Sequence, residues 1–311
     1  MKKILQDRSF RMSIILTFIF LGTGIVFLLC GLADYSWVLF ALLPIVLGIS
    51  IGALPNKRWA IIGAVITLII FLAGLLTIGL SGFICAVMSI PIIAIPIFLS
   101  SVVMHLIQRY KEIKTNSLPV LLLPLLIFII AAPTERYLKT EKRQVIEVKT
   151  EQVFNYTPEQ VYDAIKSVDT LTGEKPFLMN FDLPVPTKCV LEKEEVGGIR
   201  TCCFNGGNLS RGDFGGGTIR EKITELERGK ILRMDVTDYN LIGRKWLGFK
   251  EAIYYFDKVG ESQCKLTRVT TYTSELTPRV YWEPLERLGI NQEHDYVFSN
   301  LGNDLKRRYG K

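Results

Sequence analysis

Five long apolar segments fill most of the first 133 residues of this 311-residue chain. A helix needs about 20 predominantly apolar residues to cross the hydrocarbon core of a bilayer. The five segments are Met12 to Cys30, Trp37 to Leu54, Trp59 to about Leu80, Phe83 to about Leu106, and Leu118 to Ala132. We therefore predict a membrane α-helical bundle of about five transmembrane helices over residues 1–133. The fifth segment is barely long enough to span.

Basic residues mark alternate connections between these segments. They are Lys2, Lys3, Arg8 and Arg11 before the first segment, Lys57 and Arg58 after the second, and Arg109, Lys111 and Lys114 after the fourth. The two opposite loops, residues 31–36 and 77–82, contain no basic residue. By the positive-inside rule the N-terminus is cytoplasmic, and five crossings make the C-terminal half extracytoplasmic. Basic residues after the fifth segment favour a cytoplasmic C-terminal half instead. This alternative applies if the fifth segment does not span the membrane.

The composition of the bundle is typical of an anchor in the cell membrane. No acidic residue occurs between Trp37 and Leu106, and the one acidic or basic side chain inside a segment is His105, near the end of the fourth. Ion-coupled transporters place charged groups at mid-depth, so we expect an anchor or scaffold and interpret His105 as an interfacial residue. The first segment lacks a small-x-small cleavage site, which favours an uncleaved helix over a signal peptide.

The net charge of +7 is concentrated in the membrane part. Residues 1–133 contain nine Lys or Arg and three acidic residues, a balance of +6, which leaves 28 against 27, or +1, for the rest. This distribution argues against a nucleic-acid partner. With two His and no Cys-x-x-Cys motif a metal site is not expected, and the glycine clusters lack the Lys-Ser or Lys-Thr of a phosphate loop. We predict no cofactor.

A polar linker over residues 134–143 leads to a C-terminal domain over residues 144–311. Val145 to Phe154 alternates as a strand does, and Thr157-Pro158-Glu159-Gln160 begins a helix that we expect to end near Asp169. Residues 170–186 are irregular and placed where a flap over a cleft could lie. Thr187 to Thr273 then contains about six short strands, because glycines interrupt it repeatedly. The breaks are Gly197-Gly198, Gly206-Gly207, Gly215 to Gly217, Gly229, Gly243 and Gly260.

An amphipathic helix ends the chain, after a turn at Trp282-Glu283-Pro284. Its apolar face contains His294, Val297, Phe298, Leu301 and Leu305, at the spacing of one helical face. The opposite side is polar, so we expect the helix to lie on the apolar face of a curved antiparallel sheet. The cleft between helix and sheet is the predicted working part of the domain.

This order of elements resembles the START-like or SRPBCC superfamily, and within it the polyketide cyclase/dehydrase and lipid-transport type. The segment that opens the domain is Val153-Phe154-Asn155-Tyr156-Thr157-Pro158-Glu159-Gln160-Val161-Tyr162-Asp163-Ala164-Ile165. The resemblance covers about residues 144–308 and does not reach the membrane part. It implies an α+β helix-grip fold, a curved antiparallel sheet around a long C-terminal helix, with a deep apolar cavity. Members bind lipids, sterols, polyketides and plant hormones, and some catalyse; no residue set is common to all, so no catalytic role is implied.

Some charged side chains share a strand face with apolar residues. Glu221, Glu251 and Arg268 each alternate in register with Ile, Leu or aromatic neighbours. A buried charge is costly without a partner, so either carboxylate could pair with Arg268 inside the cavity, or strand twist could leave all three in water. The full set of ligand-cavity candidates is Glu221, Glu251, Arg268, Tyr272, Trp282, His294 and Phe298, with Tyr296 as a further wall residue.

Two functions are consistent with this domain. In the first, a membrane-anchored START-like domain binds a lipid or other hydrophobic small molecule in the cavity. In the second, a membrane-bound enzyme of cyclase or hydrolase type uses Glu221 or Glu251 as general base and Arg268 or His294 to stabilise negative charge. For His294 a packed core histidine is the competing interpretation.

The soluble half contains four cysteines, Cys189, Cys202, Cys203 and Cys264. An even set is compatible with an oxidising compartment. Because Cys202 and Cys203 point to opposite strand faces, at most one ordinary disulfide is expected, and free thiols are equally open.

Overall fold

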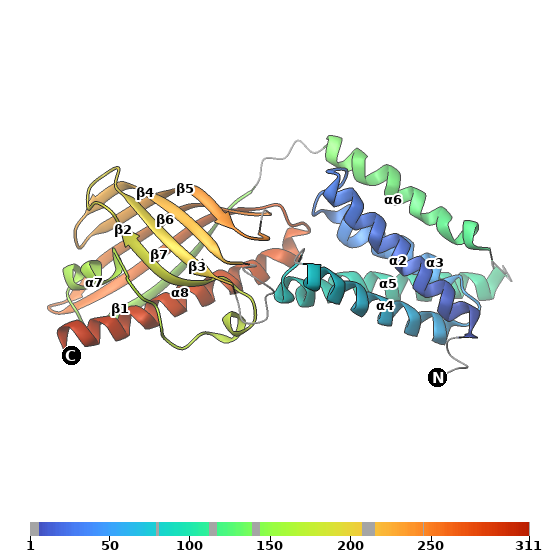
Figure 1. The fold of residues 1–311 in the computed structure, drawn as a ribbon, viewed down its shortest axis with the longest axis horizontal. Coiled ribbons are helices and arrows are strands. Elements are labelled where there is room, and N and C mark those ends of the chain that lie inside the picture. The colour runs from blue at the N-terminus through green and yellow to red at the C-terminus, as the bar shows by residue number, and fades with distance from the viewer. Residues whose placement is uncertain are drawn as a thin grey trace. The chain divides into compact units, whose positions relative to one another are not determined.

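The computed structural model describes residues 6–78, 81–111, 117–138, 144–206, 215–244 and 246–310. Apart from these gaps, the chain forms two compact units. One contains residues 6–78, 85–138 and 275–282, and the other contains residues 81–84, 144–274 and 283–310. Figure 1 follows the chain through both.

The helices before residue 139 are α2 (Arg8–Leu29), the π-helical segment η1 (Val38–Leu42), α3 (Leu43–Gly52), α4 (Lys57–Ile78), α5 (Phe83–Lys111) and α6 (Leu118–Leu138). The elements that follow are β1 (Val145–Phe154), α7 (Pro158–Ile165), the 3-10 turn η2 (Phe177–Asn180), β2 (Val185–Leu191), β3 (Ile199–Asn205), β4 (Gly217–Glu227), β5 (Ile231–Leu241), β6 (Leu247–Gly260), β7 (Gln263–Ser274) and α8 (Arg279–Tyr309).

Four helices of the described chain, α2, α4, α5 and α6, are long and apolar enough to cross a membrane. We predicted five helices of this length, and the second segment is the exception. It forms the shorter apolar helix Val38–Gly52, which consists of η1 and α3. The fifth segment, predicted to be marginal, forms the 21-residue helix α6.

Helix α6 runs past Pro133 into the segment expected as linker. The predicted segment ends at Ala132, where the apolar run stops and polar residues follow. The residues after it are held by the turn that follows α2: Arg136 pairs with Asp34 at 3.2 Å, and the Ser36 hydroxyl donates to Glu135. The extra turn of helix is therefore stabilised by tertiary contacts. Of the expected linker, residues 139–143 lie outside the described residues.

The short helix α3 is packed tightly against α5. A Cβ atom added at Gly48 would lie 2.0 Å from Ser100 Oγ and 2.4 Å from the carbonyl oxygen of Ile97. Such close backbone approach is the usual role of glycine between apolar helices. Leu47 and Ile51 on α3 are also fully buried, so α3 is enclosed by its neighbours.

The second unit contains one seven-stranded antiparallel sheet with the order β1-β7-β6-β5-β4-β3-β2. In Figure 1 this sheet curls as a half-barrel around α8, and α7 lies at one end. The predicted helix-grip architecture is confirmed in this coarse sense. The predicted glycine breaks fall between consecutive strands or at a strand end, since Gly217 begins β4 and Gly260 ends β6; Gly207 lies outside the described residues.

Both helices of this unit have different limits from those predicted. Helix α7 has the predicted capping box, in which Thr157 and Gln160 bind each other's backbone N–H, but it ends at Ile165 because Val168 instead forms a β-bridge with Cys189. Helix α8 begins at Arg279 and includes Pro284. The proline removes only the donor to the carbonyl group four residues earlier, at Val280, which is exposed and accessible to water.

Candidate functional site

A belt of polar side chains crosses the inner face of the sheet between two apolar clusters. We use "charged belt" for Arg200, Glu221, Tyr254, Arg268, Glu293 and His294. Along β7 the order is Leu266 in the larger cluster, Arg268 in the belt, and, after Thr270, Tyr272 in the smaller cluster. Helix α8 repeats this order with Phe298, His294 and Ile290. The inner face is therefore apolar at both ends and charged between them.

The first ion pair of the belt joins two neighbouring strands. Arg200 on β3 is the register partner of Glu221 on β4, and its Nε donates to Glu221 Oε2 at 2.7 Å. Both side chains are over 90% buried. Burial lowers the pKa of Arg200, but the Glu221 carboxylate raises it more, so the guanidinium stays charged.

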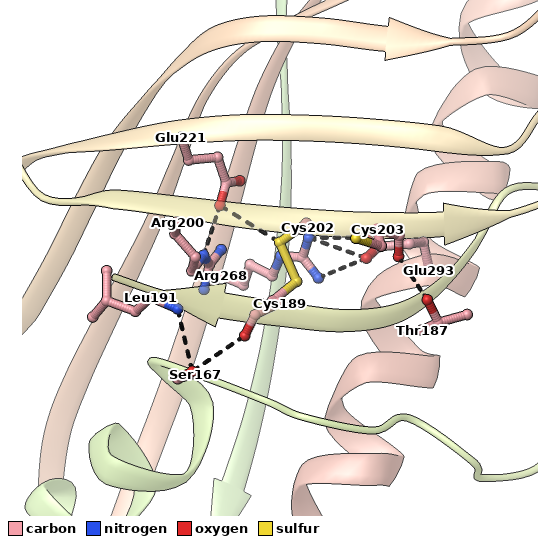
Figure 2. The surroundings of a disulfide bond; sticks show 10 residues. All are labelled: Ser167, Thr187, Cys189, Leu191, Arg200, Cys202, Cys203, Glu221, Arg268 and Glu293. Atoms are coloured by element: carbon pink, nitrogen blue, oxygen red, sulfur yellow. Dashed lines mark hydrogen bonds and ion pairs between the residues drawn. A yellow bond between two sulfur atoms is a disulfide. The ribbon is translucent and has the colours of Figure 1, made fainter. Parts of the chain in front are cut away.

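A disulfide lies directly beside this pair. Cys189 on β2 and Cys202 on β3 are register partners and form the bridge, and Cys202 Sγ is 3.8 Å from Glu221 Oε2. Figure 2 shows the bridge, both ion pairs of the belt and the hydrogen bonds of Ser167 to β2. Cys203 and Cys264 are free thiols, so the structure has the single bridge that strand alternation allows.

The second ion pair joins the sheet to α8. Both terminal nitrogens of Arg268 contact the Glu293 carboxylate, the shortest at 2.9 Å. The guanidinium of Arg268 also lies 5.5 Å from the centre of the Tyr254 ring, and that of Arg200 lies 5.4 Å from the same ring. Two cations therefore contact one aromatic ring. The Nε–H group of Arg268 is buried and has no hydrogen-bond partner among the described residues.

His294 is fully buried and held by two threonines. Thr150 Oγ1 is 2.8 Å from Nδ1, and Thr270 Oγ1 is 2.7 Å from Nε2. Because the Thr150 hydroxyl donates to Asn291, it can only accept from the imidazole, which assigns the proton to Nδ1. Burial and the charge of Arg268 lower the pKa of His294 well below 6.5, so the ring is neutral. This arrangement favours the packed-histidine interpretation over a base.

The other candidates predicted from the sequence are dispersed. Glu251 lies on the outer face, where it pairs with Arg233 at 3.0 Å, because Ala252, Tyr254 and Phe256 are the inward residues of β6. Neither predicted carboxylate pairs with Arg268: Glu221 binds Arg200 instead, since it lies opposite Arg200 in the sheet.

The aromatic candidates have three different environments. Tyr272 is buried in the smaller cluster and donates to Glu286 at 3.1 Å. Phe298 packs on Phe154 in the larger cluster. Trp282 belongs to the first unit, where its ring contacts Phe40.

The irregular segment 170–186 is held to α8 by hydrogen bonds near its start. Asn300 Oδ1 accepts hydrogen bonds from the backbone N–H groups of Thr172 and Gly173, and Tyr296 donates to the carbonyl group of Leu171. On a helical wheel Asn300 falls outside the apolar face of α8. Its role as a clamp depends on a loop that has no periodic pattern to predict it.

Three members of the belt were missed by sequence reasoning. Arg200 alternates with Cys202 and Phe204 on β3, so the rule that identified Glu221 could also have identified it. Simple alternation from Phe249 places Tyr254 on the opposite face of β6, but a bulge between Phe249 and Glu251 shifts the alternation. Glu293 is next to His294 on α8 and carries no signal of its own.

No known family model matches the chain, and no curated protein matches it in sequence. Solved structures match part of it. The ZhuI aromatase/cyclase from Streptomyces sp. R1128 is 12% identical, with 54% of this chain and 98% of that chain covered and a TM-score of 0.37. TTHA0849 from Thermus thermophilus is 18% identical, with coverages of 53% and 99% and a TM-score of 0.35.

The di-domain ARO/CYC protein StfQ of the steffimycin biosynthetic pathway is 15% identical, with 60% of this chain and 59% of that chain covered and a TM-score of 0.40. These identities bear on the fold alone. The strand order and the long C-terminal helix of the second unit are themselves those of a helix-grip domain. The C-terminal part of the chain has a START-like, or SRPBCC, fold.

Proposed function

We propose that this protein is a membrane-anchored START-like domain that binds a hydrophobic small molecule between the sheet and α8. The observation that carries the proposal is the inner face, where buried polar side chains lie between two apolar clusters. Binding sites for small apolar molecules typically combine an apolar lining with a few fixed polar groups. A lipid is one molecule of this kind. The predicted cavity itself stays a prediction.

Anchoring is supported by the way the first unit is connected. Asn56, just after α3, hydrogen-bonds Asp7 and Ser9 at the start of α2. The segment that contains this 15-residue helix therefore returns from the end of α2 to its beginning. Gln108, near the end of α5, binds Ala53 at this same end, while α6 ends beside the turn that follows α2. This arrangement supports five crossings.

Five crossings favour an extracytoplasmic domain, since the basic residues of the described connections that flank Asn56 and Gln108, namely Lys57, Arg58 and Arg109, lie at the end of the bundle where α2 begins. The disulfide between Cys189 and Cys202 supports the same side, because such bridges persist in oxidising compartments.

The enzyme alternative receives less support from the geometry. Glu251, one of the two predicted bases, is on the outer face, and Oε2 of Glu221, the other, is bound by Arg200. A general base needs an accessible oxygen within reach of substrate. The binding function is therefore our conclusion.

The test is to identify molecules that copurify with the full chain. Lipid around the helices would obscure a specific ligand, so the comparison is between the unmodified protein and Ala252→Phe, which adds a ring to the inner face at a buried position. Thr237→Phe adds the same ring on an exposed strand position and is the control. Mass spectrometry of extracts should show a compound retained by the unmodified protein and the control and depleted in Ala252→Phe. Identical extracts from three folded proteins would contradict the proposal.

A further inference from the structure

The charged belt is electrically balanced. Its described residues supply two guanidinium groups, Arg200 and Arg268, and two carboxylates, Glu221 and Glu293. His294 adds no charge, because both its ring nitrogens are held by threonine hydroxyls in a fully buried site. Toward the start of α8, Glu286 accepts hydrogen bonds from Tyr272 and Ser274. Another anion placed here would face three carboxylates.

The hydrogen-bond donors of the belt, unlike its charges, are not all matched by an acceptor. Each terminal nitrogen of Arg268 contacts Glu293, but its Nε–H is buried without a hydrogen-bond partner among the described residues. A buried donor that makes no hydrogen bond costs free energy, and an added acceptor recovers that cost. The belt thus has an unused donor and no unmatched charge.

We infer that the belt recognises an uncharged acceptor, the ester or ketone oxygen of an otherwise apolar molecule. This inference rests on the proposed function and specifies the class of ligand. A carbonyl oxygen takes the Arg268 Nε–H without bringing a charge into the low-dielectric interior, whereas a carboxylate or phosphate must be desolvated beside Glu293 and Glu221. The apolar clusters on either side accept the hydrocarbon part.

Three photoreactive probes with one tail test this assignment. They are a long-chain fatty acid with a diazirine in the chain, its methyl ester, and the corresponding alkane without a head group. Each is added to the full-length protein in lipid nanodiscs, irradiated, and mapped by mass spectrometry. Labelling of residues 144–310 is divided by labelling of residues 8–138, which corrects for partition into lipid. We expect this ratio to be about fivefold or more higher for the ester than for the acid or the alkane, the size of one buried hydrogen bond.

Arg268→Lys should remove the preference, because lysine keeps the charge beside Glu293 but lacks the Nε–H of a guanidinium. Its ester ratio should fall to that of the alkane. Arg233→Lys is the matched control, since Arg233 is also paired with carboxylates but on the outer face, and it should leave all three ratios unchanged.

The possible failures are distinct. A higher ratio for the acid, equal ratios for ester and alkane, or an ester preference that survives Arg268→Lys would each overturn the inference and leave the proposed function standing. Labelling of the domain by none of the probes, with the helices labelled normally, would count against the proposed function itself. If Arg268→Lys does not fold, the comparison of probes on the unmodified protein still decides the head-group class.

Discussion

The residues of the charged belt illustrate what a charge needs in an apolar interior. Arg200 and Glu221 are both more than 90% buried and sit 2.7 Å apart, whereas Arg233 and Glu251 form a similar pair on the outer face with partial exposure. Removing one member of a buried pair leaves its partner charged and desolvated, which costs more than the pair itself contributes. The same change at an exposed pair costs little.

We therefore expect Glu221→Gln to lower the free energy of unfolding by about 3–5 kcal/mol, and Glu251→Gln to lower it by about 1 kcal/mol or less. For a domain of this size the first change corresponds to a fall in Tm of roughly 6–20 °C. Thermal unfolding of the full-length variants in one detergent measures both. Equal effects of the two substitutions would mean that Glu221 is solvated in the folded protein.

His294 predicts a dependence of stability on pH. Its pKa is lowered in the folded state, first by burial and then by the charge of Arg268. As the pH falls through about 6.5, His294 is therefore protonated in the unfolded chain but stays neutral in the folded chain. This contribution to stability is complete above that pH and is lost as the pH falls toward the folded-state pKa, at up to about 1.4 kcal/mol per pH unit.

His294→Gln cannot gain this proton. Unfolding of both proteins between pH 7.5 and 5 should therefore show a stability difference that shrinks as the pH falls, because only the unmodified protein loses the histidine contribution. The titration of the carboxylates cancels in that difference. A difference that stays constant over this range would show that His294 has the same pKa in the folded and the unfolded chain.

At the scale of elements, the contact between α3 and α5 depends on one small residue. A side chain at Gly48 would collide with backbone atoms of α5, and backbone cannot move aside as a flexible side chain can. Gly74 lies in another long apolar helix, α4, and has nothing within 4 Å of the position where a Cβ would be added. The two glycines form a matched pair that separates the cost of the collision from the higher helix propensity of alanine.

We expect Gly48→Ala to lower the thermal stability of the first unit, since overpacking costs typically about 1–3 kcal/mol. Gly74→Ala should be neutral or slightly stabilising. Both variants are purified in the same detergent, and thermal scans with a cysteine-reactive dye then measure the difference between their unfolding temperatures. The assigned packing would be wrong if both variants behaved alike.

At the scale of the whole molecule, the side of the membrane depends on whether the helix Val38–Gly52 crosses. Four crossings place both ends of the chain on one side, and five place them on opposite sides. Fusions at the C-terminus in a bacterial host distinguish these cases. We expect active alkaline phosphatase and a dark green fluorescent protein, because the connections of the first unit support five crossings and the loop charges orient them.

The same preparation tests the bridge. Cys189 and Cys202 should resist alkylation until a reductant is added, while Cys203, which is free and partly exposed, should react without one. Bright fluorescence, a silent phosphatase and alkylation of Cys189 without reductant would together require the extracytoplasmic assignment to be abandoned.

Local pattern was sufficient for much of this molecule. Apolar run length predicted the positions of the N-terminal helices, and glycine breaks predicted the boundaries between strands, because both signals act over a few residues. Alternation identified Glu221 and Arg268 as charges on an apolar face, and both are buried. Thr157 and Gln160 likewise form the predicted capping box, since a cap depends only on its own turn.

The partners of the charges were decided by tertiary structure. Register in the sheet places Arg200 opposite Glu221, and the bulge in β6 turns Tyr254 inward and Glu251 outward. Contacts with α8 then bring Glu293 to Arg268. Pairing energy falls steeply with distance in an interior of low dielectric constant, so choosing among nearby charges requires coordinates. Local periodicity can say that a charge shares a strand face with apolar residues, but only the packed chain determines whether that charge is buried and which group neutralises it.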